Sequence, residues 1–145
     1  MSWLCWNVRG LGNQRTIHEL ASVLRAQDPA VVFLVKTWAY EDRLMKLRDD
    51  LHFDDLWVVP RETRAGGLAL LWQNSVQIDV DSFSLNHINV IVDKRKQNSW
   101  RFTGIYGMPE ASRKSETWDL LRNLHRKYSL PWLCAGDFNE IPTVT

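Results

Sequence analysis

Residues 30–35 form a continuous apolar run, Ala-Val-Val-Phe-Leu-Val, which constrains the fold more than any other stretch. β-Branched residues dominate the run and no polar residue interrupts it. This pattern is typical of a strand that is buried on both faces of its sheet. Such a strand needs a covering layer on each side, so we expect a sheet with helices outside it.

Helical and strand periodicities alternate along the rest of the chain. Helices are predicted at residues 14–25, 41–51 and 110–128, the last with Trp118, Leu121, Leu124 and Tyr128 facing inward. Strands are predicted at residues 2–8, 56–60, 68–72, 76–80, 87–92 and 100–106, with a final short buried strand in residues 133–139. The order is β-α-β-α, then a strand meander, then α-β. It predicts an α/β (α+β) fold with one mixed sheet or a pair of sheets and helices outside.

Composition sets the broad class of the protein. A chain of 145 residues can form one domain with a core, and its net charge of +1 means that a nucleic-acid site would be a local patch. We expect most of the eight tryptophans in packing. Cys5 and Cys134 lie in apolar runs and are predicted to be buried free thiols, which fits a reducing compartment. No stretch resembles a membrane span or a signal peptide, so we expect an intracellular location.

Polar side chains end several of the predicted strands. Asn7 ends the first strand, Lys36 ends the apolar run, and Tyr106 ends a later strand. Asp137 and Asn139 end the last strand, where alternate residues share a face and stand about 6–7 Å apart. An anionic oxygen beside a neutral amide suits a cation, or a water and a phosphate. Strand ends are rigid and open, so these residues predict a functional site.

Three other patterns receive plainer interpretations. The Gly10-Leu11-Gly12 turn lacks the third glycine of a dinucleotide-binding loop, because Arg15 stands there, and we interpret it as a tight turn. The basic run at residues 94–96 is interpreted as a solvated hairpin tip rather than a phosphate contact. The histidines lack the spacing of a nucleophile–base pair or a metal site. They are His18, His52, His87 and His125.

Five short motifs stand in order along the chain. They are residues 6–10 (Trp-Asn-Val-Arg-Gly), 32–37 (Val-Phe-Leu-Val-Lys-Thr), 66–72 (Gly-Gly-Leu-Ala-Leu-Leu-Trp), 104–107 (Gly-Ile-Tyr-Gly) and 136–139 (Gly-Asp-Phe-Asn). In this order the motifs resemble the endonuclease/exonuclease/phosphatase superfamily, whose fold is that of DNase I. The Tyr-Gly-Met-Pro-Glu stretch at 106–110 and the Pro-Trp-Leu stretch at 131–133 look most like the endonuclease domain of plant LINE-type retrotransposons.

The resemblance implies a four-layer α/β/β/α sandwich that cleaves phosphodiester bonds of DNA with Mg²⁺. It implies that Asn7 binds the metal and orients the catalytic base, and that Tyr106 contacts the phosphate. Asp137 would bind metal and orient or deprotonate the attacking water, and Asn139 would steady the transition state. The chemical logic is neutralisation of developing charge together with activation of water.

The sequence departs from the family pattern at two places. Lys36 stands where the family has the main metal carboxylate, and an ammonium cannot ligate Mg²⁺. The family's downstream Ser-Asp-His motif does not occur in the 145 residues. We therefore expect residues 1–145 to be a single incomplete domain that lacks its C-terminal portion and has little or no nuclease activity. We also hypothesise that the Lys36 ammonium pairs with Asp137 as a tethered cation, although Lys36 could equally point to solvent.

Other interpretations stay open at this level. The chain could be a non-catalytic remnant that binds nucleic acid or a protein, or a pseudogene product without a selected role. Another branch of the superfamily, acting on phosphoinositides or sphingolipids, shares the core motifs. Exposed apolar surface predicts possible self-association. A domain that nicks chromosomal DNA would have to act in the nucleus.

Overall fold

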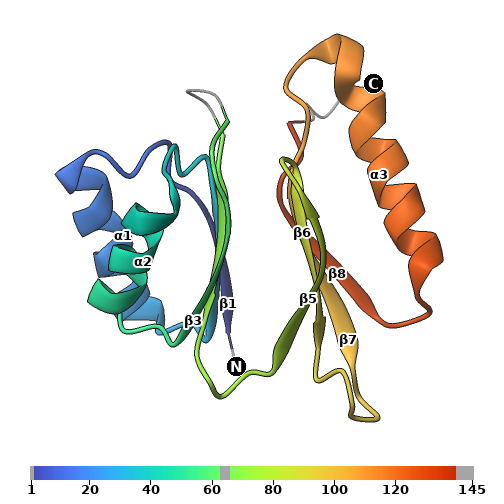
Figure 1. The fold of residues 1–145 in the computed structure, drawn as a ribbon, viewed down its shortest axis with the longest axis horizontal. Helices are drawn as coiled ribbons and strands as arrows, with labels where there is room; N and C mark the ends of the chain where they lie inside the picture. Colours follow the sequence, from blue (N-terminus) through green and yellow to red (C-terminus); the bar gives the residue numbers. More distant parts are fainter. Residues whose placement is uncertain (1, 63–65, 140–145) are drawn as a thin grey trace.

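The computed structural model describes residues 2–62 and 66–139. Two four-stranded sheets face each other, with α1 and α2 outside the first sheet and α3 outside the second (Figure 1). The predicted fold class is confirmed, because the layers follow the order α/β/β/α. None of the helices within these two ranges has the length and apolar character that crossing a bilayer requires.

The first sheet has the strand order β1–β2–β4–β3. Its strands are β1 (Trp3–Asn7), β2 (Val31–Val35), β3 (Asp55–Val59) and β4 (Leu68–Trp72). β1 runs parallel to β2, and α1 (Gln14–Gln27) provides the crossover that a parallel pair needs. β4 runs antiparallel to both of its neighbours. All five residues of β2 are buried, which confirms the prediction of a strand covered on both faces.

The two helices on the first sheet have clear start and stop signals. α1 begins after Asn13, whose Oδ1 accepts a 2.9 Å hydrogen bond from the N–H of Arg15, and it ends at Asp28 in a left-handed conformation. α2 (Glu41–Asp50) carries two carboxylates in its first turn, which suits the positive end of the helix dipole. Both helices therefore follow the predicted ranges within about two residues.

The second sheet has the order β5–β6–β7–β8. Its strands are β5 (Ile78–Ser84), β6 (His87–Val92), β7 (Trp100–Tyr106) and β8 (Trp132–Asp137). The first three form an antiparallel meander, and β8 returns parallel to β7 through η1 (Ala111–Arg113) and α3 (Lys114–Lys127). The predicted strands at 87–92 and 100–106 have these bounds, whereas β5 extends further along the chain than the predicted 76–80.

Two hydrophobic cores lie on the two faces of the first sheet. Even-numbered residues of β2 face the core beneath α1 and α2, and odd-numbered residues face the core between the sheets. Phe33 reaches across to the second sheet, where its ring meets Phe102 edge-on at a centroid distance of 6.2 Å. A Cβ on Gly104 would stand 2.5 Å from the Phe33 ring, so the glycine makes room for this contact.

Three predictions about burial are wrong. Trp118 does not face inward but is 42% exposed, because α3 turns Thr117 toward the sheet instead. Cys5 is exposed and Cys134 is half-buried, because β1 and β8 are edge strands rather than central ones. Leu133 is 49% exposed for the same reason. Apolar runs at sheet edges look like buried strands in sequence, since sequence does not show which strands lack a neighbour.

Candidate active site between the sheets

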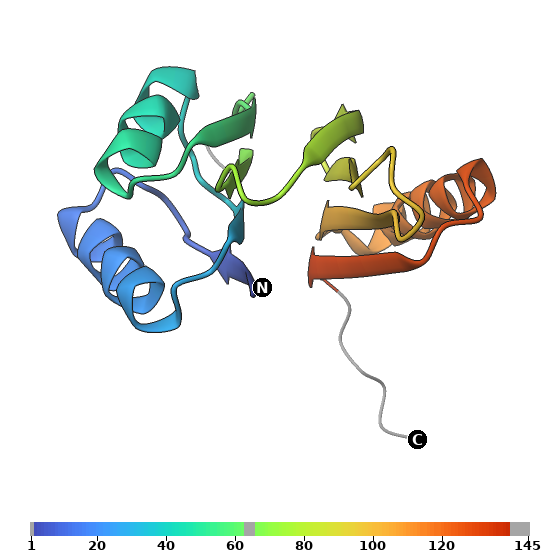
Figure 2. The same cartoon turned by 90° about the horizontal axis from the view of Figure 1, so that it is seen from below.

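Two edge strands, one from each sheet, bring predicted site residues together. Asn7 is the last residue of β1, and Asp137 is the last residue of β8, where it pairs with Tyr106 of β7. Figure 2 shows β1 and β8 on the same side of the sandwich, and the two strands contact each other. Across this contact the Asn7 Nδ2 donates a 3.4 Å hydrogen bond to the Asp137 Oδ2. The face-to-face sheets thus join residues from opposite ends of the chain.

A cleft of about 330 Å³ opens at this junction. Its lining consists of Cys5, Trp6, Asn7, Val35, Gly136, Asp137, Phe138 and Asn139. The volume lies at the lower end of the range for small-ligand sites, roughly 300–1,000 Å³. Three of the predicted site residues therefore border one cleft.

Asn139 is held differently from the prediction. β8 ends at Asp137, and Asn139 adopts a left-handed φ of 53°, so strand alternation does not extend to it. Its backbone N–H donates to the Asp137 Oδ1 at 2.9 Å, and its Nδ2 donates to the Gly107 carbonyl oxygen at 2.6 Å. The Gly107 N–H in turn donates to the Asp137 carbonyl oxygen at 2.6 Å. These bonds fix the Asp137 carboxylate, because each of its oxygens accepts a hydrogen bond.

Lys36 does not make the predicted ion pair with Asp137. No salt bridge in the described ranges joins the two residues; the Lys36 Nζ lies 5.5 Å from the centroid of the Tyr106 ring, a cation–π distance. Lys36 follows β2 with a φ of 55°, so its side chain does not continue the alternation of the strand. The structure thus places the Lys36 ammonium against Tyr106 rather than against Asp137.

A metal site can be tested against the donor atoms present. The Asn7 Oδ1 is buried and accepts no hydrogen bond from any described residue. A buried acceptor without a donor is suited to coordinate a cation. Asp137 supplies one carboxylate nearby. However, residues 2–62 and 66–139 contain no cluster of three or more His, Cys, Asp or Glu side chains that could hold a metal ion. Hard divalent cations prefer several oxygen ligands, so this donor set is incomplete for Mg²⁺.

Tyr106 lines a neighbouring cleft of about 300 Å³ rather than the cleft of Asn7 and Asp137. The β3–β4, β5–β6 and β7–α3 connections form its walls. The Asn86 Nδ2 donates a 2.8 Å hydrogen bond to the Tyr106 carbonyl oxygen, which holds the end of β7 against the β5–β6 turn. Tyr106 therefore borders this second cleft, with the Lys36 ammonium over its ring.

Two supporting residues were not among the predicted site residues. Gly107 receives the Asn139 side chain, and a Cβ on Gly107 would collide with the Phe138 carbonyl. Trp118 stacks on the Phe138 ring at a centroid distance of 6.5 Å and an interplanar angle of 13°, which anchors the end of β8 against α3. In the sequence, a glycine directly after Tyr106 was the available sign that Gly107 supports the site. Trp118 gives no comparable sign, because a single tryptophan on a helix is most simply explained by packing.

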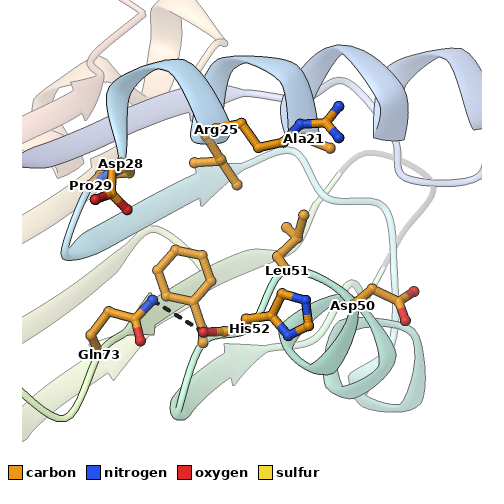
Figure 3. Close-up of a pocket in the computed structure, with 10 residues that line it drawn as sticks. Ala21, Arg25, Asp28, Pro29, Asp50, Leu51, His52 and Gln73 are labelled. Carbon is orange, nitrogen blue, oxygen red and sulfur yellow. Dashed lines mark hydrogen bonds between the residues drawn. The ribbon is translucent and has the colours of Figure 1, made fainter.

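A further cavity, of about 360 Å³, lies elsewhere (Figure 3). It lies between the end of α1 and the α2–β3 connection, with Arg25, Asp50 and His52 among its lining residues. The Gln73 side chain closes one side through a 3.1 Å hydrogen bond to the His52 carbonyl oxygen. Pro29, which precedes β2, also lines the cavity, so the cavity lies at the opposite end of the first sheet from Asn7. None of the predicted site residues borders it.

Solved structures with the same fold cover nearly all of this chain. The catalytic domain of human Nocturnin, solved with bound sulfate, matches with a TM-score of 0.69 at 15% identity, over 95% of this chain and 63% of that one. TDP2 from D. rerio, complexed with a single-strand DNA product, matches at 0.66 and 14%, over 96% and 61%. The endonuclease domain of TRAS1, a telomere-specific non-LTR retrotransposon, matches at 0.65 and 12%, over 96% and 59%. This chain thus spans about 60% of the length of each of these domains.

One family model also matches nearly the whole sequence. No curated protein matches the chain. The model of the Endonuclease/Exonuclease/phosphatase family matches residues 4–143, which confirms the superfamily that the five motifs predicted; the closer relation to plant LINE endonucleases stays a prediction. With the motifs, the α/β/β/α sandwich and the family match in agreement, this chain belongs to the Endonuclease/Exonuclease/phosphatase family.

Proposed function

We propose that this chain derives from a LINE-type endonuclease domain, binds DNA at the cleft of Asn7 and Asp137, and cleaves it slowly or not at all. The supporting observation is the pairing of Asn7 with Asp137 across the two sheets, beside Tyr106, while Lys36 stands where the family resemblance expects a carboxylate. A domain with this role would act in the nucleus.

The chain's own residues suggest how a phosphodiester would be held. The Asp137 carboxylate is fixed by two hydrogen bonds. In this position it would orient an attacking water or accept a proton from it. Tyr106 pairs with Asp137 in the sheet, and the Lys36 ammonium lies over the Tyr106 ring, so this end of β7 offers a phosphate oxygen a donor and a positive charge. Asn139 serves this arrangement by bonding Gly107, and it would have to release that bond to contact a substrate.

Lys36 is the proposed cause of weak cleavage. Mg²⁺, when bound in this family, supplies neutralisation of the charge that develops on the phosphoryl oxygens. An ammonium in place of a carboxylate removes a metal ligand and adds repulsion toward the cation. Removal of a single electrostatic contribution in an active site typically lowers the rate about 100- to 1,000-fold, roughly 3–4 kcal/mol.

A non-catalytic nucleic-acid-binding domain is the second candidate. Lys36 favours it, because an ammonium over the Tyr106 ring attracts phosphate without requiring a metal. A protein-binding remnant and a pseudogene product without a role are the further alternatives, and both predict no salt-dependent binding to DNA.

A nicking assay tests the proposal. Supercoiled plasmid is incubated with the chain, with its Asp137→Asn variant and with the TRAS1 endonuclease domain, in Mg²⁺ at near-physiological salt. We expect nicking by the chain to lie at least about 100-fold below that of TRAS1. In parallel, fluorescence anisotropy with a labelled duplex should show binding that weakens steeply as NaCl rises.

The outcomes separate the candidates. Nicking at a rate close to that of TRAS1, and abolished by Asp137→Asn, would contradict the impairment. Salt-dependent binding with background nicking that Asp137→Asn does not change would leave only the binding function. Absence of binding at low salt would overturn the role in nucleic-acid recognition altogether.

A further inference from the structure

Two exposed aromatic side chains stand on the loop that leads from β2 to α2. Trp38 is 39% exposed and Tyr40 is 58% exposed, and Arg61 contacts both residues. We name Trp38, Tyr40 and Arg61 the aromatic platform. We propose that the aromatic platform stacks unpaired bases of a nucleic-acid strand whose backbone lies at the neighbouring clefts. This inference rests on the proposed nucleic-acid function and adds that the protein contacts unpaired bases beside the clefts.

The platform belongs to an ordered loop rather than to a free tip. The Trp38 N–H donates to the Gly66 carbonyl oxygen at 2.9 Å, and the Thr37 carbonyl oxygen accepts from the Leu11 N–H at 3.0 Å. The Thr37 side chain is fully buried. The loop is therefore tied to the loops on both sides of it, so that stacking a base would require little ordering of the protein.

Trp38 is held in a conformation that needs explanation. Its φ is 50°, a left-handed value that a bulky aromatic residue rarely adopts. The indole lies against Gly10, where a Cβ would collide with the ring. Strained residues of this kind persist where surrounding structure enforces them, often at ligand-binding sites. Here the strain presents one indole face to the chain and leaves a substantial part of the ring in solvent.

Arg61 joins the two aromatic residues. Its Nη1 donates a 3.1 Å hydrogen bond to the Trp38 carbonyl oxygen, and its Cζ lies 5.2 Å from the centroid of the Tyr40 ring. The guanidinium thus fixes the Tyr40 ring by a cation–π contact and adds a flat, positively charged surface beside it. Aromatic rings next to an arginine plane form the kind of surface on which bases of any sequence stack.

The platform is continuous with the candidate active site. Its loop begins at Lys36, whose ammonium lies over the Tyr106 ring. Gly66, which bonds Trp38, also lines the cleft of Tyr106. A strand with a phosphate at Lys36 would therefore carry its next bases toward Trp38.

The charge beside the rings is mixed, because the Arg61 guanidinium contacts Tyr40 whereas Glu41 and Asp42 follow Tyr40 directly in the first turn of α2. The two carboxylates offset the attraction of Arg61 for a phosphate and repel one placed near them. A neutral base does not meet this repulsion. Paired bases keep their faces stacked inside a duplex, so the rings select unpaired ones.

The test compares a fluorescein-labelled dT12 oligonucleotide with an oligonucleotide of the same length whose central four positions are abasic. Both have the same phosphates and differ only in bases. Anisotropy should show that the wild-type chain binds dT12 about 5- to 100-fold more tightly than the abasic probe, and that Trp38→Leu removes this preference. Trp38→Phe should keep most of it. Phe83→Leu is the matched control, because Phe83 is also an exposed aromatic residue but lies on β5.

Thermal melts identify any variant that fails to fold, and Tyr40→Leu then carries the test, since that ring is the more exposed. Equal affinity of the wild-type chain for both probes would overturn the stacking role while leaving phosphate binding intact. Failure to bind either probe would overturn the stacking role, and binding of the labelled duplex then decides separately whether the proposed function holds. A preference for dT12 that Phe83→Leu removes as fully as Trp38→Leu would also contradict the assignment to the platform.

Discussion

At the scale of single residues, Lys36 has the largest expected effect on metal binding at the candidate site. Asn7 and Asp137 meet across the sheets, and the Asn7 Oδ1 is a buried acceptor to which no described residue donates a hydrogen bond. These groups are oxygen donors of the type that Mg²⁺ binds. Lys36 contributes a positive charge to the same end of the sheet, and its ammonium lies over the Tyr106 ring.

Replacing Lys36 by glutamate should create a response to Mg²⁺. Lys36→Glu adds a carboxylate, and binding at ten times the dissociation constant would stabilise the fold by about 1.4 kcal/mol. We expect Tm to rise by about 5 °C in MgCl₂ relative to NaCl of equal ionic strength. Lys36→Gln removes the charge without adding a ligand and serves as the control. Melting of Lys36→Glu that is insensitive to Mg²⁺ would count against this position as a ligand.

His87 is a buried titratable residue outside the site. Ser84 Oγ lies 2.7 Å from its Nδ1 and Ser82 Oγ lies 3.2 Å from its Nε2. Burial, with a smaller effect of the Lys127 charge, lowers the pKa of His87 from 6.5 to about 4. The folded protein therefore holds this histidine neutral where the unfolded chain already binds a proton.

Stability should consequently fall as pH is lowered from 6.5 to about 4. The unfolded state binds more protons in this window, so the free energy of unfolding decreases by about 3 kcal/mol across it. Urea denaturation at a series of pH values measures the slope, and His87→Gln should flatten it. Equal slopes for His87→Gln and the wild type would refute the assignment.

At the scale of elements, a chain of polar side chains crosses the second sheet under α3. Asn89 of β6 donates to the Asp81 Oδ2 of β5 at 3.2 Å and accepts from the Thr103 Oγ1 of β7 at 2.7 Å. The Trp132 Nε1 of β8 donates to the same Thr103 oxygen at 2.8 Å. One residue from each strand thus takes part, which joins all four strands by side chains as well as by backbone. Asn89 and Thr103 are fully buried.

Removing Asn89 should destabilise the whole sheet. Asn89→Ala leaves the Thr103 hydroxyl without its acceptor and removes one of the two donors to the Asp81 Oδ2, which keeps Lys127. We expect a loss of about 1–3 kcal/mol in the free energy of unfolding. Chemical denaturation followed by tryptophan fluorescence gives the value. Asn98→Ala, in the exposed β6–β7 turn, should change stability by less than about 0.5 kcal/mol. If the two variants lower the free energy of unfolding equally, the side-chain network adds nothing to the stability that the backbone hydrogen bonds of the sheet provide.

At the scale of the whole molecule, the two sheets are held together by apolar packing yet keep open edges. Phe33 and Phe102 join the sheets, whereas β1 and β8 stand at the ends of their strand orders. Leu133 is 49% exposed on β8. An exposed leucine on an edge strand invites association with another chain.

We expect Leu133→Lys to reduce self-association, because a charge on an edge strand opposes pairing with a second edge. Sedimentation velocity at two protein concentrations should show a concentration-dependent species in the wild type and mostly monomer in the variant. Met45→Lys places the same charge on α2, at an exposed residue away from strand edges. A wild type that is monomeric at both concentrations, or a Met45→Lys variant that dissociates equally, would contradict the prediction.

Much of this architecture could be predicted from local sequence. The run at 30–35 indicated β2, and alternation indicated β6 and β7 with their bounds, because burial leaves a periodic signal within a few residues. The five motifs predicted the family, and the strand pattern predicted Asn7 and Asp137 at strand ends. These features depend on neighbours in the sequence.

The tertiary structure decided the rest, because those features depend on residues far apart in the chain. Strand order made β1 and β8 edges, and this exposed Cys5 and Leu133. Packing of two sheets, not any local pattern, brought Asn7 to Asp137. Left-handed backbone at Lys36 and Asn139 turned both side chains to partners that strand alternation could not predict. Sequence thus determined the elements and the family, and long-range packing determined which polar groups share a cleft.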